Sequence, residues 1–115
     1  MLKLYVVVRQ DLAPGYQAAQ SLHAFREFQH FFPEIEKHWY ETSNTIIIKG
    51  IADERGLLNL GKEALKAGIK FASFREPDLD NQLTAMAFEP GERTGEFLYH
   101  LNLACEEYRN RPVVL

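Results

Sequence analysis

Polar and titratable side chains gather in two stretches of this 115-residue sequence, and each stretch follows an apolar run. The first stretch begins at Arg9 and Asp11, directly after a β-branched run, and reaches His23. The second, residues 75–82, carries three carboxylates. Carboxylates and histidine are the side chains that orient water or move protons near neutral pH. These two stretches are therefore the candidates for chemistry.

His23 is the histidine best placed for such chemistry. It lies on the side of a predicted helix that faces away from the apolar residues of that helix. It is there either a proton carrier or ligand-orienting donor beside the preceding loop, or a partly exposed surface histidine. The residues alone leave both interpretations open.

The spacing of these residues predicts no metal site and no cofactor. His23 and His30 lie two helical turns apart, about 10 Å, which is too far for one small ion. The acidic residues 76–81 lack the glycine and the bidentate glutamate of a calcium loop. The loop before the first helix has a single glycine, Gly15, and so forms neither a phosphate loop nor a dinucleotide fingerprint. No G-x-S-x-G segment is present, which disfavours a serine hydrolase.

The composition is that of an ordinary globular protein with a small negative charge. Apolar residues make up 46% of the chain and the formal net charge is −3. No basic block is present, so a nucleic-acid partner must be met by a local patch. The single cysteine, Cys105, excludes an internal disulfide. No apolar run approaches the ~20 residues that span a bilayer, and no signal peptide is visible, so we expect a cytoplasmic protein without membrane contact.

Apolar runs and helical periodicity alternate along the chain and indicate an α/β fold. Strands are expected at 4–8, 45–49, 69–74 and 83–88. Helices are expected at 16–32, at 33–40, between an N-cap at Asp53 and a stop at Gly68, and at 96–108. The connection 78–82 is too short for a crossover helix, so the fourth strand should run antiparallel to the third. The chain is thus predicted to be one domain, a mixed sheet between helical layers.

The first helix is expected to turn one apolar face toward the core. At 100° per residue this face collects Ala18, Leu22, Phe25, Phe28 and Phe32. The stripe expected on the opposite face consists of Tyr16, Gln20, His23 and Glu27. This phase would leave Gln20 and His23 outside the core.

Two segments carry a resemblance to a known family. The first is Val-Val-Arg9-Gln-Asp11-Leu, followed by Gly15 and by Ala18-Ala-Gln20-Ser-Leu-His23-Ala24. The second is Phe74-Arg-Glu76-Pro, followed by Asn81-Gln82-Leu-Thr84-Ala-Met-Ala-Phe. They resemble the type II peptidyl-tRNA hydrolase family, whose pattern is R-x-D-L…G-K-x-A-A-Q-x-x-H-A after the first strand and D-A-G-x-T-Q…T before the last. The order of strands and helices agrees over about residues 3–104.

The resemblance implies a three-layer α/β/α sandwich whose mixed four-stranded sheet has one antiparallel strand. It also implies hydrolysis of the ester that joins a peptide to the 3′ end of tRNA, without a metal or other cofactor, and often as a homodimer. Glu76 would orient or activate water, Thr84 and loop N–H groups would stabilise the oxyanion, and His23 would complete the catalytic set. The substrate-binding residues carried over are Arg9, Asp11, Gly15, Tyr16, Gln20 and Gln82.

The sequence departs from the family pattern in the length of both loops, which are shorter, and in the T-Q of the second, which is at best Asn81-Gln82. Two single positions differ as well. Tyr16 stands where the family has its loop lysine, and Glu76 stands where it has an aspartate. Loss of the lysine removes a cation that could hold a phosphate or polarise the ester. A second interpretation is therefore a non-catalytic module on the same fold that holds RNA ends or a protein partner. A third is a homodimer with a structural or regulatory role.

Overall fold

Four apolar segments form one sheet in the computed structural model of the chain, which describes residues 2–105. The strands are β1 (Lys3–Arg9), β2 (Thr45–Ile51), β3 (Phe71–Glu76) and β4 (Gln82–Phe88), in the order β2-β1-β4-β3. β1 and β2 are parallel, whereas β4 is antiparallel to both of its neighbours. The mixed four-stranded sheet with one antiparallel strand is thereby confirmed.

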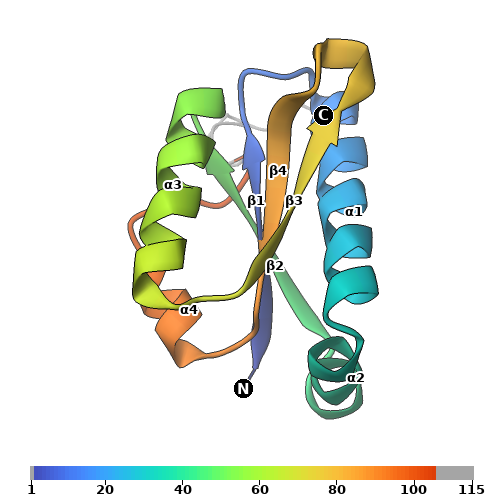
Figure 1. The fold of residues 1–115 in the computed structure, drawn as a ribbon, viewed down its shortest axis with the longest axis vertical. Coiled ribbons are helices and arrows are strands. Elements are labelled where there is room, and N and C mark those ends of the chain that lie inside the picture. Colours follow the sequence, from blue (N-terminus) through green and yellow to red (C-terminus); the bar gives the residue numbers. More distant parts are fainter. Residues whose placement is uncertain (1, 106–115) are drawn as a thin grey trace, which may run out of the picture.

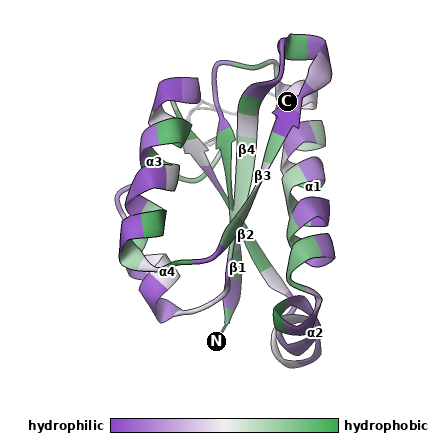
Figure 2. Cartoon of the chain, in the orientation of Figure 1, coloured by the Kyte–Doolittle hydropathy of each residue, from purple (hydrophilic) through white to green (hydrophobic). Residues whose placement is uncertain are grey.

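Helices cover both faces of this sheet and complete the three layers (Figure 1). α1 (Pro14–Phe31) and α2 (Pro33–Thr42) lie on one face, and α3 (Glu54–Ala67) and α4 (Glu92–Phe97) lie on the other. Each face has its own buried apolar cluster, because alternate residues of β1 point to opposite sides. Val6 packs with Phe28 of α1, and Val7 packs with Leu57 of α3. Figure 2 shows the apolar colour concentrated along the central strands.

The ends of α3 follow the sequence signals. Asp53 caps the first turn, since its carboxylate accepts the backbone N–H of Gly56 at 3.0 Å. Gly68 ends the helix in the left-handed region, at φ 70°, where a residue without Cβ is favoured. Both predicted boundaries are confirmed.

The last predicted helix, 96–108, is wrong in its extent. α4 ends at Phe97, and the chain then runs back along the outer edge of β2. The Gly50 N–H donates to the carbonyl of Asn102 at 2.9 Å, and the Ala104 N–H donates to that of Ile48 at 3.0 Å. The alternation of apolar and polar residues in this part reflects pairing with a strand. Residues 106–108 of that prediction lie outside the described chain.

The predicted phase of α1 is also wrong, and the error is informative. The buried residues of this helix are Gln20, Ser21, Ala24 and Phe28. Leu22, expected in the core, is 65% exposed, and Ala18 is exposed as well. An apolar count assigns glutamine to the solvent side, whereas Gln20 is 1% exposed beneath the helix. A buried amide needs hydrogen-bond partners, and those partners mark the candidate site.

Candidate functional site

The start of α1 and the β3–β4 connection lie at the same end of the sheet (Figure 1). This end carries the carboxyl termini of β1, β2 and β3, because all three run in one direction. Carboxyl ends of parallel strands are a common place for ligands in α/β folds. The two polar stretches meet at this end of the sheet: Gln20 Nε2 donates to Glu76 Oε1 at 2.9 Å.

A tight turn presents the Glu76 carboxylate at this end. Glu76 ends β3, and Pro77 begins a short 3₁₀ turn that reaches Leu79. The carboxylate accepts the Asp78 N–H at 3.2 Å and so caps this turn. Asp80 and its neighbour Asn81 then adopt left-handed φ values of 53° and 59°, which Asp and Asn tolerate. The turn therefore fixes the carboxylate through its own backbone.

Gln20 joins Glu76 to the buried hydroxyl of Thr84. The Thr84 hydroxyl donates to Gln20 Oε1 at 2.5 Å, while Gln20 Nε2 donates to Glu76. Because the Gln20 amide oxygen accepts from Thr84, its NH₂ group points toward Glu76. The hydrogen bonds therefore run in one direction, from Thr84 through Gln20 to Glu76. Thr84 is 0% exposed, and a second, longer contact at 3.4 Å joins its hydroxyl to the Phe74 carbonyl. It reaches Glu76 only through the glutamine.

A β-bulge turns Thr84 toward α1. Phe74 pairs with Ala85 and Arg75 pairs with Leu83, so Thr84 is an extra residue on β4. Such a bulge re-aims a side chain and is frequent beside functional sites. Ala85 belongs to the apolar cluster under α1, and the bulge places the Thr84 hydroxyl on that same side, against Gln20.

Neighbouring charges and hydrogen bonds keep Glu76 ionised. The hydrogen bond from Gln20, followed by the one from the Asp78 N–H, lowers the pKa of Glu76, and the nearby His23 contributes in the same direction. Tyr16 lies one helical turn before Gln20. Partial burial, together with the charges of Glu76 and Asp78, raises the pKa of the Tyr16 phenol. The site thus holds a carboxylate beside a neutral phenol at neutral pH.

Two stacked aromatic rings lie on the same face of the sheet as this carboxylate. The His23 imidazole stacks on the Phe74 ring, with centroids 4.4 Å apart and planes inclined by 11°. Phe74 and Glu76 alternate along β3 and therefore lie on the same face of the sheet. His23 is exposed, and Phe74 is half-buried. His23 was predicted as a site residue, whereas Phe74 had no predicted role.

Arg9 organises a second polar cluster at the same end of the sheet. Its Nε and Nη2 donate to the two oxygens of Asp11, each at 2.9 Å. Its Nη1 donates to Gln82 Oε1 at 2.9 Å and to the carbonyl of Leu83 at 3.2 Å. Arg9 as a whole residue is 7% exposed. The hydrogen bond with Asp11 raises the pKa of Arg9 and lowers that of Asp11.

The Arg9 cluster lies toward α3, away from Gln20. Glu54, at the start of α3, accepts the Leu83 N–H at 2.8 Å, and its charge adds to the raised pKa of Arg9. Glu54 was not predicted as a site residue, because its position one residue after an N-cap carries no signal for this contact. Gly15, the second residue of α1, is exposed and has no atom within 4 Å of where a Cβ would stand.

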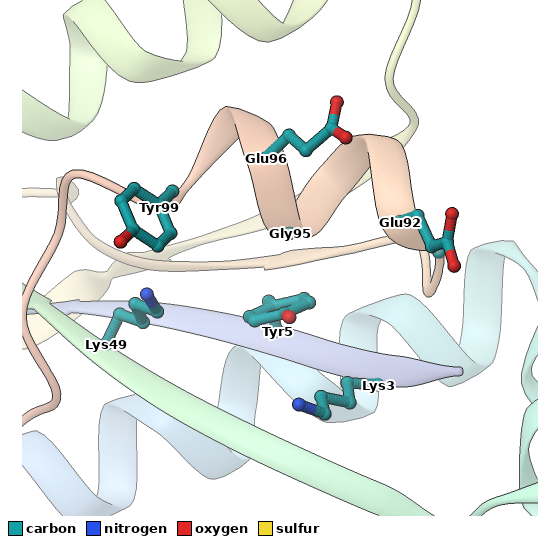
Figure 3. Close-up of a pocket in the computed structure, with 8 residues that line it drawn as sticks. Lys3, Tyr5, Lys49, Glu92, Gly95, Glu96 and Tyr99 are labelled. Carbon is teal, nitrogen blue, oxygen red and sulfur yellow. The ribbon is translucent and has the colours of Figure 1, made fainter. Parts of the chain in front are cut away.

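A separate hollow of about 740 Å³ lies between α4 and the sheet (Figure 3). Lys3 and Tyr5 of β1 and Lys49 of β2 line one side, and Glu92 and Tyr99 line the other. Lys49 is partly engaged, since its ammonium donates to two backbone carbonyls that follow α4. None of the residues that carry the family resemblance lines this hollow.

Within residues 2–105, no three His, Cys, Asp or Glu side chains are grouped as metal ligands. No helix of that part is both long and apolar enough to cross a bilayer.

The fold and the site define a three-layer α/β domain that presents an ionised carboxylate at the carboxyl edge of its sheet. The profile of the family described as peptidyl-tRNA hydrolase PTH2 matches residues 2–102. The chain therefore belongs to the peptidyl-tRNA hydrolase PTH2 family, which confirms the resemblance seen in the sequence.

Other comparisons bear on the fold alone. The search of curated proteins gave no match to the chain. Among solved structures, the chain is similar to the protein of unknown function Atu0240 from Agrobacterium tumefaciens strain C58, with a TM-score of 0.63 and 14% identity. The alignment covers 90% of this chain and 98% of that one. At this identity the likeness supports the α/β architecture only.

Proposed function

We propose that this protein hydrolyses the ester bond between a peptidyl or N-blocked aminoacyl group and tRNA, with Glu76 as the group that positions the attacking water. The observation that carries the proposal is the Gln20 hydrogen bond to Glu76, at 2.9 Å, which joins the two family segments in one site. Membership of the PTH2 family supports the substrate class.

Glu76 acts in this proposal as an oriented acceptor for water. Gln20 and the Asp78 N–H occupy one lone pair on each carboxylate oxygen, and further acceptor capacity remains. The water oxygen attacks the ester carbonyl, the bond from that carbon to the ribose oxygen breaks, and the ribose oxygen takes up a proton. A lowered pKa makes Glu76 a weak base, so its main contribution is to hold water in position.

Thr84 serves this proposal as a positioning residue. Its hydroxyl orients the Gln20 amide, and that amide in turn keeps Glu76 charged and in place. The neutral Tyr16 phenol and the free N–H groups of the first turn of α1 are the donors left for the developing oxyanion. Tyr16 therefore supplies a hydrogen bond where the family pattern has a lysine.

Arg9, Asp11 and Gln82 are proposed to shape the substrate side of the site from the neighbouring cluster. Their mutual bonds fix the loop that joins β1 to α1 against the start of β4. Gly15 leaves open space at the first turn of α1, where the acyl or phosphate groups of a substrate would approach.

A second candidate function is a binding module that holds RNA ends without cleaving them. The tyrosine in place of the loop lysine favours it, as does the net charge of −3. Turnover separates the two functions. Purified protein is mixed with tRNA that carries a labelled N-acetylaminoacyl group, and release of the label is followed over time.

Release that exceeds the amount of protein supports the hydrolase. No release, together with retention of uncharged tRNA that falls steeply with salt, would overturn it in favour of the binding module. The same proposal locates the protein in the cytoplasm, where translation supplies the substrate. A homodimer, expected from the family, is tested by light scattering of the purified chain.

A further inference from the structure

The His23–Phe74 pair is a built aromatic platform. The two rings are nearly parallel. Phe74 is the lower ring, and it is held in place because it packs against the apolar cluster under α1. The upper ring, His23, is exposed, and no other ring among residues 2–105 contacts it. One face of the imidazole is thus covered and the other is open to a flat ligand.

The imidazole nitrogens make no hydrogen bond within the described part of the chain. A histidine that moves protons is ordinarily oriented by a hydrogen bond from its second nitrogen to a carboxylate or carbonyl. Here ring stacking alone fixes the orientation of the imidazole. The geometry therefore favours use of the ring face over use of the nitrogen atoms.

The platform and the Glu76 carboxylate are neighbours on one face of the sheet. Phe74 precedes Glu76 by two residues on β3, a separation of about 6.6 Å along the strand. In acylated tRNA, a ribose separates the ester from the terminal base. A base that stacked on His23 would thus carry its ribose, and the ester on that ribose, toward Glu76.

We infer that His23 is a stacking platform for the 3′-terminal nucleobase of the acylated RNA, an adenine in tRNA, and sets the position of the ester relative to Glu76. The inference rests on the proposed function for its substrate. It assigns His23 to substrate positioning in place of proton transfer. Stacking on an aromatic ring accepts a purine through its π-face, and single bases on such platforms contribute appreciably to binding.

Two substitutions at one position separate stacking from proton transfer. His23→Phe keeps a flat ring and loses the nitrogens, whereas His23→Ala loses both. Both variants lack the imidazole nitrogens, so the difference between them reports the ring. We expect His23→Phe to hydrolyse the labelled tRNA with kcat and KM within twofold of wild type. We expect His23→Ala to raise KM about tenfold with little change in kcat.

His30→Ala on the same helix is the matched control, since His30 is exposed and remote from the site. Equal loss of kcat in His23→Phe and His23→Ala would overturn the inference, because it would return His23 to proton transfer. Equal wild-type kinetics in both variants would overturn it as well.

A binding measurement keeps this test independent of catalysis. Adenosine monophosphate and ribose 5-phosphate are added separately to the wild-type protein, and the imidazole proton resonances are followed by NMR. A ring current should move the His23 signals with adenosine monophosphate only, while the His30 signals stay in place. A shift without tRNA hydrolysis would support the platform and reject the hydrolase. Hydrolysis without any His23 shift would do the reverse.

Discussion

Two polar clusters share the carboxyl edge of the sheet, and they use their hydrogen bonds in opposite ways. In the Arg9 cluster, three nitrogens of the guanidinium donate four bonds to Asp11, Gln82 and the backbone of Leu83. In the Glu76 cluster, two donors among residues 2–105 hold the carboxylate, which keeps free acceptor capacity. The first cluster is closed and the second is open.

This difference indicates a structural role for the Arg9 cluster and a reactive role for the Glu76 cluster. A guanidinium whose N–H donors are already bonded inside the protein has few donors left for a phosphate. A fixed carboxylate with free lone pairs can instead order water. Arg9 braces Asp11 and is itself 7% exposed. The contrast predicts that substitutions in the closed cluster lower stability and that those in the open cluster lower activity.

The largest effect on stability is expected at Arg9. Arg9→Met keeps the apolar stem and removes every donor, which leaves the Leu83 carbonyl and Gln82 amide without their cation. We expect the free energy of unfolding, measured with urea, to fall by about 3 kcal/mol. Arg55→Met, an exposed position of α3, should change it by less than about 0.5 kcal/mol. Unchanged stability with strongly reduced hydrolysis would instead make Arg9 a substrate contact.

A smaller effect is expected where the open cluster is anchored. Thr84→Val removes the buried hydroxyl and leaves Gln20 Oε1 without a donor, so unfolding free energy should fall by about 2 kcal/mol and hydrolysis should slow. Thr84→Ser keeps the hydroxyl and loses a methyl group, at about 1 kcal/mol. Hydrolysis by the serine variant should stay close to wild type. Equal activity of the two variants would show that this hydroxyl does not position Gln20.

The smallest effect is a displacement in pH. Gln20 is the main cause of the lowered pKa of Glu76, so its N–H favours the ionised form. Gln20→Met removes this donor, the pKa of Glu76 rises, and the acid limb of the kcat/KM profile should move to higher pH. Gln29→Met on the same helix should leave the profile unchanged. A limb that moves to lower pH would contradict the assignment of that limb to Glu76.

The sequence predicted the fold well because the fold depends on long patterns. Apolar runs located all four strands, and the short connection after Asp78 predicted the antiparallel β4. The packing of individual residues was harder to predict from the sequence. The phase of α1 was misjudged because Gln20 is buried by bonds to residues 56 and 64 positions away. The bulge at Thr84 likewise depends on pairing between strands, and no local pattern announces it.

The sequence predicted which residues belong to the site better than it predicted how they are arranged. Family spacing singled out Gln20, Glu76 and Thr84, which the structure joins in one chain of hydrogen bonds. It gave no indication that Arg9 would belong to a separate cluster on the other side of the sheet. The role of Phe74 was also not predicted, since an apolar strand residue has no sequence signal for stacking on a histidine.

The central claim, that the open cluster around Glu76 is the hydrolytic centre, is tested most directly by the hydrolysis rate of Glu76→Gln. Glutamine can still accept the Gln20 bond but carries no charge to hold water. We predict a rate on acylated tRNA at least about 100-fold below wild type, with Asp78→Asn, an exposed carboxylate two residues away, within twofold of it. Hydrolysis by Glu76→Gln at the wild-type rate would contradict the account.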